Sequence, residues 1–312
     1  MLVRLWRIVP HPENDSNGRS SVRFGLELNE FDWPGGPAAM GRHVADIGRR
    51  SEKAGFHSIW VWDHFIQLRR WADPLLEGWL TLAYLAAATE RIRLGTLVTG
   101  VTYRYPAVLV KQASTLDVLS GGRSYFGVGA AWNEREHGAF GVRFPPIAER
   151  FEMLEDLLQI AHRAWKGDTG PFEGKRTSLT EQMDNPPPAQ RPHPPILIGG
   201  GGERKTLRLV AKYADATHQT TSDPEVMRRK LEVLRRHCET EGRDYDEIER
   251  YCGLELRPPR GQGGPIADAS TLLERLEALS EAGSQGVFIV LPNLADSDAI
   301  ERFGEEVIAR AG

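Results

Sequence analysis

The stretch RIRLGTLVTGVTYRYPAVLVKQASTLDVLSGGRSYFGVG, residues 91–129, contains the repeating unit on which the fold prediction depends. It begins with a short run of β-branched and apolar residues at 92–98 and continues with helical periodicity at 106–119. A second apolar run at 123–129 ends it. Two short apolar runs joined by a helical segment are typical of a βαβ unit in a parallel sheet. The stretch therefore predicts parallel strands that are covered by helices.

The same alternation continues along the chain on both sides of this stretch. Apolar runs predict eight strands, at 22–28, 57–63, 92–98, 123–129, 195–200, 215–220, 250–256 and 286–292. Segments of helical periodicity predict helices at 38–54, 75–89, 106–119, 147–165, 203–213, 224–241, 270–282 and 297–310. Gly55 and Gly283 stand where a positive φ would end a helix. Asp223 followed by Pro224 fits an N-cap with proline in the first turn.

Eight βα units predict a single α/β domain, the (β/α)8 TIM barrel, with insertions in its exit loops. The length of 312 residues agrees with this architecture, which typically needs roughly 250 residues before insertions. An open doubly wound sheet is the alternative, but no dinucleotide fingerprint follows the first strand. Long connections at 130–146 and 167–194 are the predicted insertions. We expect residues 1–21 to form a flexible leader in front of the barrel domain at 22–312, because 9–21 are polar and proline-containing.

Composition limits the classes of partner and compartment. The formal net charge is −4 and the basic residues are dispersed along the sequence. The sequence therefore has no concentration of positive charge of the kind that binds nucleic acid or an anionic membrane. Cys238 and Cys252 are the only cysteines, without CxxC spacing, which favours a reducing compartment. No stretch approaches the roughly 18 apolar residues of a membrane span, and no signal peptide is recognisable. We expect a cytoplasmic protein that acts on a small molecule.

Two polar residues directly follow the second predicted strand. In a TIM barrel the active site lies at the carboxyl ends of the strands, and Asp63 and His64 stand at such an end. Histidine titrates near neutral pH and is suited to proton transfer or to holding a developing charge. The alternative is that the pair merely caps the following loop.

Small residues follow the third and fourth predicted strands. The segments GTLVTG (95–100) and GVGAAWNE (127–134) place small side chains where a planar ligand can approach the backbone. Ordinary buried strands followed by turns, with glycine filling the barrel corners, explain the same residues. The segments alone leave both interpretations open.

Four consecutive glycines, Gly199–Gly202, follow the fifth predicted strand and open a helix. Their N–H groups can turn toward an anion at the positive end of the helix dipole, and Arg204 and Lys205 add positive charge nearby. The alternative is a flexible turn. Because four glycines cost considerable backbone entropy, the tract favours a phosphate-bearing ligand.

Other catalytic patterns do not occur in the sequence. It contains no HExxH, GxSxG or GxxxxGK[ST] motif, and its histidines lack metal-ligand spacing. We therefore expect no metal site and no serine-hydrolase or P-loop chemistry.

Several segments together resemble the luciferase-like flavin- and F420-dependent oxidoreductases, in order and in spacing. They are SIWVWDHF (58–65), residues 91–123, FGVGAAWNEREHGAFG (126–141), ERFEMLEDLLQI (149–160) and HPPILIGGGGERKTLRLVAKYADA (193–216). The resemblance covers about residues 22–312 and implies a barrel with a coenzyme in its mouth. It also implies a bulge after the third strand with a non-prolyl cis peptide between Leu97 and Val98.

The resemblance also implies roles for individual residues. Asp63 would contact the deazaflavin ring, and His64 corresponds to the active-site histidine of sugar-phosphate dehydrogenase relatives. Coenzyme ring and chain contacts are implied for Leu97, Val98, Thr99, Ala130 and Ala131, and phosphate contacts for Gly199, Gly200, Gly201 and Gly202. Those relatives have a glutamate acid just after the fourth-strand glycines, where this chain has Trp132. This departure puts glucose-phosphate oxidation in doubt.

The residues and the resemblance are compatible with three functions. The first is an F420-dependent oxidoreductase that transfers a hydride to or from an unidentified small organic substrate. The second is an FMN-dependent monooxygenase, which needs a separate flavin reductase, because reduced FMN activates oxygen whereas reduced deazaflavin is a hydride carrier. The third is a coenzyme-binding protein without catalysis. From the resemblance we also expect the protein to form a homodimer.

Overall fold

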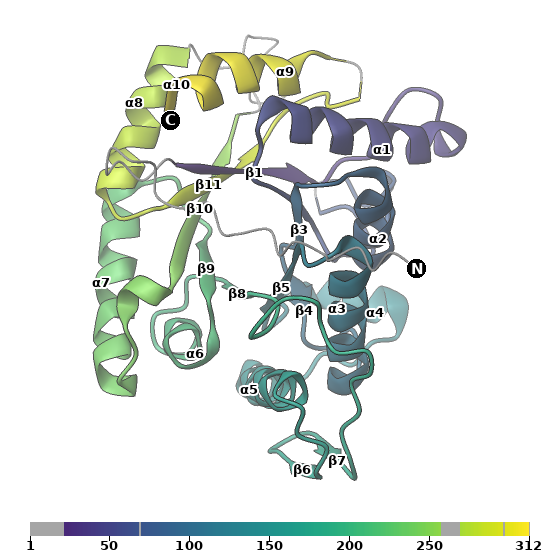
Figure 1. Cartoon of the computed structure of the whole chain (residues 1–312), viewed down its shortest axis with the longest axis vertical. Coiled ribbons are helices and arrows are strands. Elements are labelled where there is room, and N and C mark those ends of the chain that lie inside the picture. The colour runs from purple at the N-terminus through teal and green to yellow at the C-terminus, as the bar shows by residue number, and fades with distance from the viewer. Residues whose placement is uncertain (1–21, 69, 257–268, 296, 312) are drawn as a thin grey trace, which may run out of the picture.

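The computed structural model describes residues 22–68, 70–256, 269–295 and 297–311. Its barrel strands are β1 (Arg23–Leu28), β2 (Ser58–Val61), β3 (Arg93–Thr96), β5 (Ser124–Gly129), β8 (Ile196–Gly199), β9 (Ala216–Gln219), β10 (Glu249–Glu255) and β11 (Gly286–Val290). These strands are parallel and run in the order β3-β2-β1-β11-β10-β9-β8-β5, and pairing of β3 with β5 closes the ring. Figure 1 shows the helices around its outside. The predicted closed barrel and its eight strands are confirmed.

The third strand is interrupted by a bulge. β3 ends at Thr96, and β4 (Thr99–Gly100) then resumes pairing with β5. Leu97 and Val98 lie between the two pieces and are joined by a cis peptide bond. This geometry is the one that the resemblance implies.

The helices follow the predicted segments closely. Their bounds are α1 (Pro37–Ala54), α2 (Gly78–Ala88), α3 (Pro106–Ser120), α4 (Glu134–Phe140), α5 (Ile147–Trp165), α6 (Thr206–Tyr213), α7 (Pro224–Glu241), η1 (Tyr245–Glu247), α8 (Ala269–Glu281), α9 (Ala299–Phe303), η2 (Gly304–Ile308) and α10 (Ala309–Ala311). The predicted stops Gly55 and Gly283 have φ angles of 93° and 101°. The Asp223 carboxylate accepts a hydrogen bond from Glu225 N–H at 2.8 Å, as expected of an N-cap.

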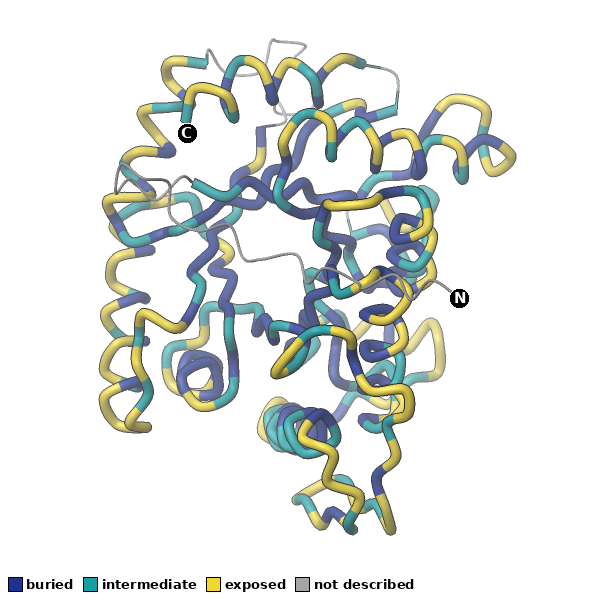
Figure 2. The backbone as a smooth tube through the Cα atoms, in the orientation of Figure 1, coloured by how far each residue is buried: buried dark blue, intermediate teal, exposed yellow. Residues whose placement is uncertain are grey.

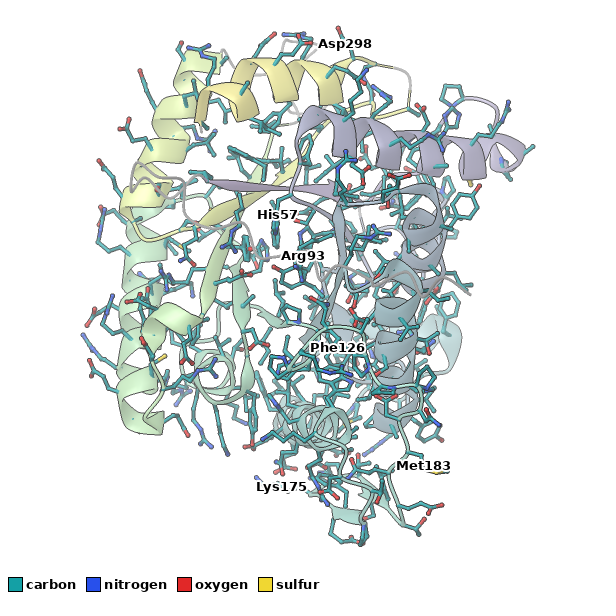
Figure 3. All side chains as sticks on the ribbon, in the orientation of Figure 1. His57, Arg93, Phe126, Lys175, Met183 and Asp298 are labelled. Carbon is teal, nitrogen blue, oxygen red and sulfur yellow. The ribbon has the colours of Figure 1, made fainter. Side chains whose placement is uncertain are left out.

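Both long connections contain short elements that the sequence prediction missed. The segment 130–146 forms α4, and the segment 167–194 forms an antiparallel pair, β6 (Phe172–Glu173) and β7 (Ser178–Leu179). Figure 3 shows Lys175 and Met183 of the second connection at the periphery of the molecule. The final helix, predicted as one piece at 297–310, consists of α9, the π-helical η2 and α10.

The structure does not test the predicted leader, but it does test for membrane-spanning helices. The predicted leader, residues 1–21, lies outside the described residues and stays a prediction. Among the helices that the structure describes, none has both the length and the apolar composition required to cross a membrane.

The barrel interior is filled by large aromatic side chains that lie beside glycines. Trp60 is fully buried and packs against Phe288 at a centroid distance of 4.5 Å. A Cβ on Gly25 or Gly95 would lie within 2.8 Å of the Trp60 ring. The Trp60 ring therefore fits only because these two positions have no side chain. Figure 2 shows the strands buried and the outer helix faces exposed.

A basal polar cluster of Arg23, Tyr125, Glu249 and Tyr251 lies near the amino ends of the strands. The Arg23 guanidinium and both tyrosine hydroxyls donate hydrogen bonds to the Glu249 carboxylate, Tyr125 at 2.9 Å and Tyr251 at 3.0 Å. Burial alone would raise the pKa of Glu249, but Arg23 and the two hydroxyls lower it. The cluster compensates a buried charge at the end of the barrel that usually serves stability.

Candidate active site

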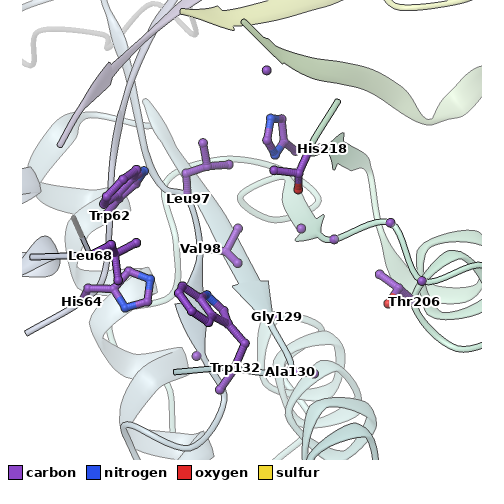
Figure 4. Close-up of a pocket in the computed structure, with 18 of the residues that line it drawn as sticks. Trp62, His64, Leu68, Leu97, Val98, Gly129, Ala130, Trp132, Thr206 and His218 are labelled. Carbon is purple, nitrogen blue, oxygen red and sulfur yellow. The ribbon is translucent and has the colours of Figure 1, made fainter. Parts of the chain in front are cut away.

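A cavity of about 750 Å³ opens at the carboxyl ends of the barrel strands. Its wall includes residues from the ends of β1, β2, β5, β8, β9, β10 and β11 and from the bulge after β3. Most of the predicted site residues line it. They are His64, Leu97, Val98, Ala130, Ala131, Gly199, Gly200, Gly201 and Gly202. The sequence therefore predicted the location of the cavity correctly, and Figure 4 shows His64, Leu97 and Val98 around it.

His64 lies between two tryptophans in the cavity wall. Its residue exposure is only 8%, and its ring centroid lies 6.2 Å from that of Trp62 and 5.7 Å from that of Trp132. Both rings meet the imidazole edge to face. Trp132 itself is 63% exposed and lines the same cavity. The two indoles restrict the orientation of the imidazole.

Glu136 lies directly behind His64, and the sequence prediction missed it. Its Oε2 atom is 2.7 Å from His64 Nδ1. The same carboxylate accepts hydrogen bonds from the backbone N–H groups of Phe65 and Ile66 and from the Tyr103 hydroxyl. The side chain is fully buried. One carboxylate thus fixes the whole turn that carries His64.

The environment of Glu136 keeps it ionised. Burial alone would raise the pKa of Glu136, but the hydrogen bonds and charge of His64, together with Tyr103 and the Phe65 N–H, lower it. Burial and the bond to Glu136 raise the pKa of Tyr103, so its hydroxyl donates and stays protonated. Since an ionised carboxylate only accepts, His64 Nδ1 must carry the proton of this contact. His64 Nε2 is then the ring nitrogen left for a ligand in the cavity.

A local signal for this residue was present in the sequence. Glu136 lies on α4, a short helix that Asn133 caps by accepting from Glu136 N–H at 3.4 Å. Asn followed three residues later by Glu fits the start of a helix. It does not show that Glu136 meets His64, which lies 72 positions away.

Asp63 and Thr99, both predicted coenzyme contacts, lie behind the cavity wall. The fully buried Asp63 carboxylate accepts two hydrogen bonds from Arg104, at 2.5 and 3.0 Å. The Thr99 hydroxyl accepts from Trp79 Nε1 at 3.0 Å. Neither residue lines the cavity. The physical reason for the Asp63 placement is that the largely buried Arg104 needs a compensating carboxylate.

The four glycines form a tight loop between β8 and α6. Gly200 has a φ of 112°, a conformation that favours glycine. A Cβ on Gly202 would lie 2.8 Å from Thr206 Oγ1, so a side chain there would fill the space beside this hydroxyl. Thr220, Thr221 and Ser222 also line this part of the cavity. A cradle of backbone and hydroxyl groups of this kind fits a phosphate group.

The cation beside this loop differs from the predicted ones. Arg204 and Lys205 do not line the cavity, and Lys205 Nζ lies 5.2 Å from the centroid of the Phe151 ring. Lys230 of α7 does not line the cavity either, but it is held against the glycine loop, because its Nζ donates to Gly201 O. The difference arises because α6 begins at Thr206, three residues later than predicted, so Arg204 and Lys205 precede its first turn.

Arg150 of α5 holds the wall formed after β5. Its guanidinium donates to Ala130 O at 3.2 Å, to Pro145 O at 3.0 Å and also to Ala131 O. Ala131 has a positive φ of 58°, which is unusual for a residue with a side chain. The guanidinium therefore stabilises the strained wall that carries Ala130 and Ala131 into the cavity.

Comparison with known proteins relates this arrangement to one family. The family model for luciferase-like monooxygenases matches residues 25–256. An F420-dependent glucose-6-phosphate dehydrogenase of Kineococcus radiotolerans is 31% identical over 218 residues. That match covers 68% of this chain and 63% of the relative, so it spans less than two thirds of the relative's length.

Solved structures agree in fold. The F420-dependent tetrahydromethanopterin reductase of Methanopyrus kandleri has a TM-score of 0.75 at 19% identity, covering 94% of this chain and all of the reductase chain. The monooxygenase RslO1 of Streptomyces bottropensis has a TM-score of 0.78 at 17% identity, with 93% and 100% covered. At these identities the likeness establishes the fold, which a reductase and a monooxygenase share.

Proposed function

The chain belongs to the luciferase-like monooxygenase family, and on this premise we propose that it is an oxidoreductase that transfers a hydride between coenzyme F420 and a small organic substrate. The observation that carries the proposal is the His64–Glu136 pair in the wall of a cavity that also contains the glycine loop. The family's F420-dependent relative at 31% identity supports the choice of coenzyme.

Particular residues would hold the coenzyme. The loop Gly199–Gly202, with Thr206 and Lys230 beside it, is suited to the phosphate. Leu97 and Val98 from the bulge offer a surface for the ring. Coenzyme F420, when bound, supplies the hydride chemistry, and the protein supplies position and electrostatics.

His64 would handle the proton that accompanies hydride transfer. With Nδ1 bonded to Glu136, its Nε2 can donate a proton to a substrate oxygen or accept one from it. The Glu136 carboxylate stabilises the positive charge on the ring whenever both nitrogens are protonated. Trp62 and Trp132 pack against the imidazole, which is only 8% exposed.

Glucose 6-phosphate is not the substrate that this cavity favours. The indole of Trp132 lies directly beside His64, with 5.7 Å between the ring centroids, and takes up space next to the imidazole. Among the described residues that line the cavity, none is a lysine or arginine that could hold a second phosphate. We propose a substrate with a carbonyl or hydroxyl group at the reacting end.

An FMN-dependent monooxygenase is the second candidate function. The observation that favours it is the match of residues 25–256 to the family model for luciferase-like monooxygenases. It would require a flavin reductase as partner, because FMN must be reduced before it can activate oxygen. The coenzyme therefore decides the reaction class.

Parallel titrations of the purified protein with F420 and with FMN, followed by fluorescence, test the proposal. We expect tight binding of F420 and weak binding of FMN. Gly201→Asp should weaken F420 binding roughly 5- to 1000-fold, because two like charges about 4 Å apart repel each other by about 1 kcal/mol in water and about 4 kcal/mol near a protein surface. Gly201→Ala is the steric control, since its Cβ displaces the same Lys230 side chain without adding charge. Preferential binding of FMN would replace the proposed function by the monooxygenase.

A second copy of this chain is the partner that we propose for α2 and α3. The outward face of α2 is apolar, and Leu80 is 75% exposed beside exposed Tyr84. The neighbouring α3 adds exposed Val108. A helix that is apolar on its outer face is usually buried against another surface.

Light scattering after size exclusion tests this homodimer. Leu80→Glu should convert a dimer to a monomer, because it places a charge inside an apolar interface. Thr240→Glu is the matched control, because Thr240 is exposed on α7, a helix that has no part in the proposed interface. A monomeric wild-type protein, or a dimer that survives Leu80→Glu, would contradict the assignment.

A further inference from the structure

His218 is a second imidazole in the cavity wall. It lies near the end of β9 and is only 6% exposed, although it lines the cavity. Its ring stacks on Phe288 at a centroid distance of 5.1 Å and an interplanar angle of 17°. On the neighbouring strand, a Cβ at Gly253 would lie 3.2 Å from His218 Nε2. Stacking on Phe288 therefore holds the ring, and the absence of a side chain at Gly253 leaves space beside Nε2. Figure 4 shows His218 at the cavity together with His64.

The imidazole of His218 has no hydrogen-bond partner within the described part of the chain, and its Nε2 atom is buried. Buried polar atoms in proteins are nearly always hydrogen-bonded, so an exception at a cavity points to a ligand. Burial lowers the pKa of His218 to about 4. At neutral pH the ring is therefore uncharged and offers one N–H donor and one nitrogen acceptor.

Two connections place His218 on the side of the cavity where the coenzyme is proposed to lie. Gly199 is its partner in the β8–β9 ladder, and Gly200 N–H donates to His218 O at 3.1 Å. Phe288, on which the ring stacks, belongs to the core cluster against which Leu97 and Val98 pack. His218 thus lies between the proposed phosphate loop and the proposed ring surface.

We propose that His218 binds the coenzyme by a hydrogen bond between its uncharged imidazole and an uncharged polar atom of the ring system or its side chain. The inference rests on the proposed function and adds to it a coenzyme contact that the sequence patterns did not indicate. An uncharged ring is suited to a carbonyl, hydroxyl or ring N–H group, whereas the phosphate is left to the glycine loop and Lys230. Removal of this contact should weaken binding of the coenzyme without lowering the stability of the coenzyme-free protein.

The test compares wild type, His218→Phe and His218→Asn by F420 titration and by thermal unfolding without coenzyme. Phenylalanine keeps a flat ring on Phe288 but has no polar atom. We expect its dissociation constant for F420 to rise about fivefold to tenfold, the effect of one lost hydrogen bond. Its unfolding temperature without coenzyme should be unchanged or higher, because a buried unbonded polar group has been removed. Asparagine, which can still form a hydrogen bond, should recover part of the affinity.

His193→Phe is the matched control. His193 also stacks on an aromatic ring, that of Trp165 at 5.4 Å, but it does not line the cavity. Its replacement should leave F420 affinity unchanged. Equal affinity of wild type and His218→Phe would overturn the inference, and so would a loss of affinity accompanied by a clear fall in the unfolding temperature without coenzyme. If wild type binds FMN instead, the same comparison is made with FMN. Failure of wild type to bind either coenzyme would reject the proposed function itself, and this inference with it.

Discussion

Replacing Glu136 by glutamine is expected to lower turnover about 100-fold while leaving affinity for the coenzyme nearly unchanged. The amide has the same shape but no charge, so it no longer fixes His64 Nδ1 as donor or stabilises the protonated ring. We also expect about 2 kcal/mol less free energy of unfolding, because the hydrogen bonds from Phe65 N–H and Tyr103 lose their charged acceptor. Turnover is followed by F420 absorbance with any substrate that wild type accepts, and stability by urea unfolding.

Two further variants serve as comparisons for Glu136→Gln. Glu134→Gln removes a carboxylate from the same helix, but Glu134 is exposed, so turnover and stability should stay at wild-type values. His64→Ala should lower turnover at least as far as Glu136→Gln and should likewise spare coenzyme binding. If Glu136→Gln retained full turnover, the role of the carboxylate in orienting His64 would be rejected, and Glu136 would serve only to hold the turn.

The same variant should change how stability depends on pH. Because the pKa of Glu136 is lower in the folded chain than in the unfolded one, its stabilisation is fully present above roughly pH 4.5 and is lost as pH falls through the folded value. Glu136→Gln lacks this contribution. The stability gap between the two proteins is therefore largest near neutral pH and narrows in acid, and urea unfolding at several pH values measures it.

Gly127→Ala is expected to cost more than about 3 kcal/mol of unfolding free energy or to prevent folding altogether. A Cβ on Gly127 would lie 1.8 Å from Thr96 O, and a backbone atom cannot move aside as a flexible side chain can. The contact is also held by Thr96 Oγ1, which donates to Gly127 O at 2.7 Å. The yield of folded protein and urea unfolding provide the measurements.

Gly138→Ala is the control for this substitution. Gly138 lies inside α4, and a Cβ there would meet no atom within 4 Å. Alanine favours helix over glycine, so we expect stability to be unchanged or up to about 1 kcal/mol higher. A Gly127→Ala protein as stable as the Gly138→Ala protein would show that β3 and β5 can separate freely, contrary to their pairing in the closed barrel.

Most barrel strands could be predicted because short apolar runs such as β2 (SIWV) and β11 (GVFIV) are typical of strands that are covered on both faces, whereas β9 (ATHQ) was predicted from its place in the alternation of strands and helices. The helix in segment 130–146 was harder to predict, because α4 has only seven residues and Gly138 within it weakens the helical pattern. The interruption at Leu97–Val98 came from resemblance to a family and not from any rule of spacing. Local patterns thus predict the elements, and short or irregular pieces depend on tertiary contacts.

The site was predictable only as far as single strand ends reveal it. His64 and the glycine loop follow apolar runs directly, so the barrel rule places them at the cavity. The meeting of His64 with Glu136, and of Lys230 with Gly201, joins loops or helices far apart in the chain. Sequence spacing carries no information about such contacts. Whether Asp63 would reach the cavity or bond Arg104 is decided in the same way, by packing.

The basal polar cluster and the cavity wall occupy opposite ends of the same strands. Arg23 and Glu249 begin β1 and β10, whereas Leu254 and Val290 stand near the other ends of β10 and β11. Five strand residues span about 16 Å, beyond the distance at which substitutions usually influence one another's stability. Substitutions at Leu254, Val290 or the exposed Trp132 should therefore leave the stabilisation from the basal polar cluster unchanged, so the wall that faces the substrate can vary while the opposite end of the barrel stays intact.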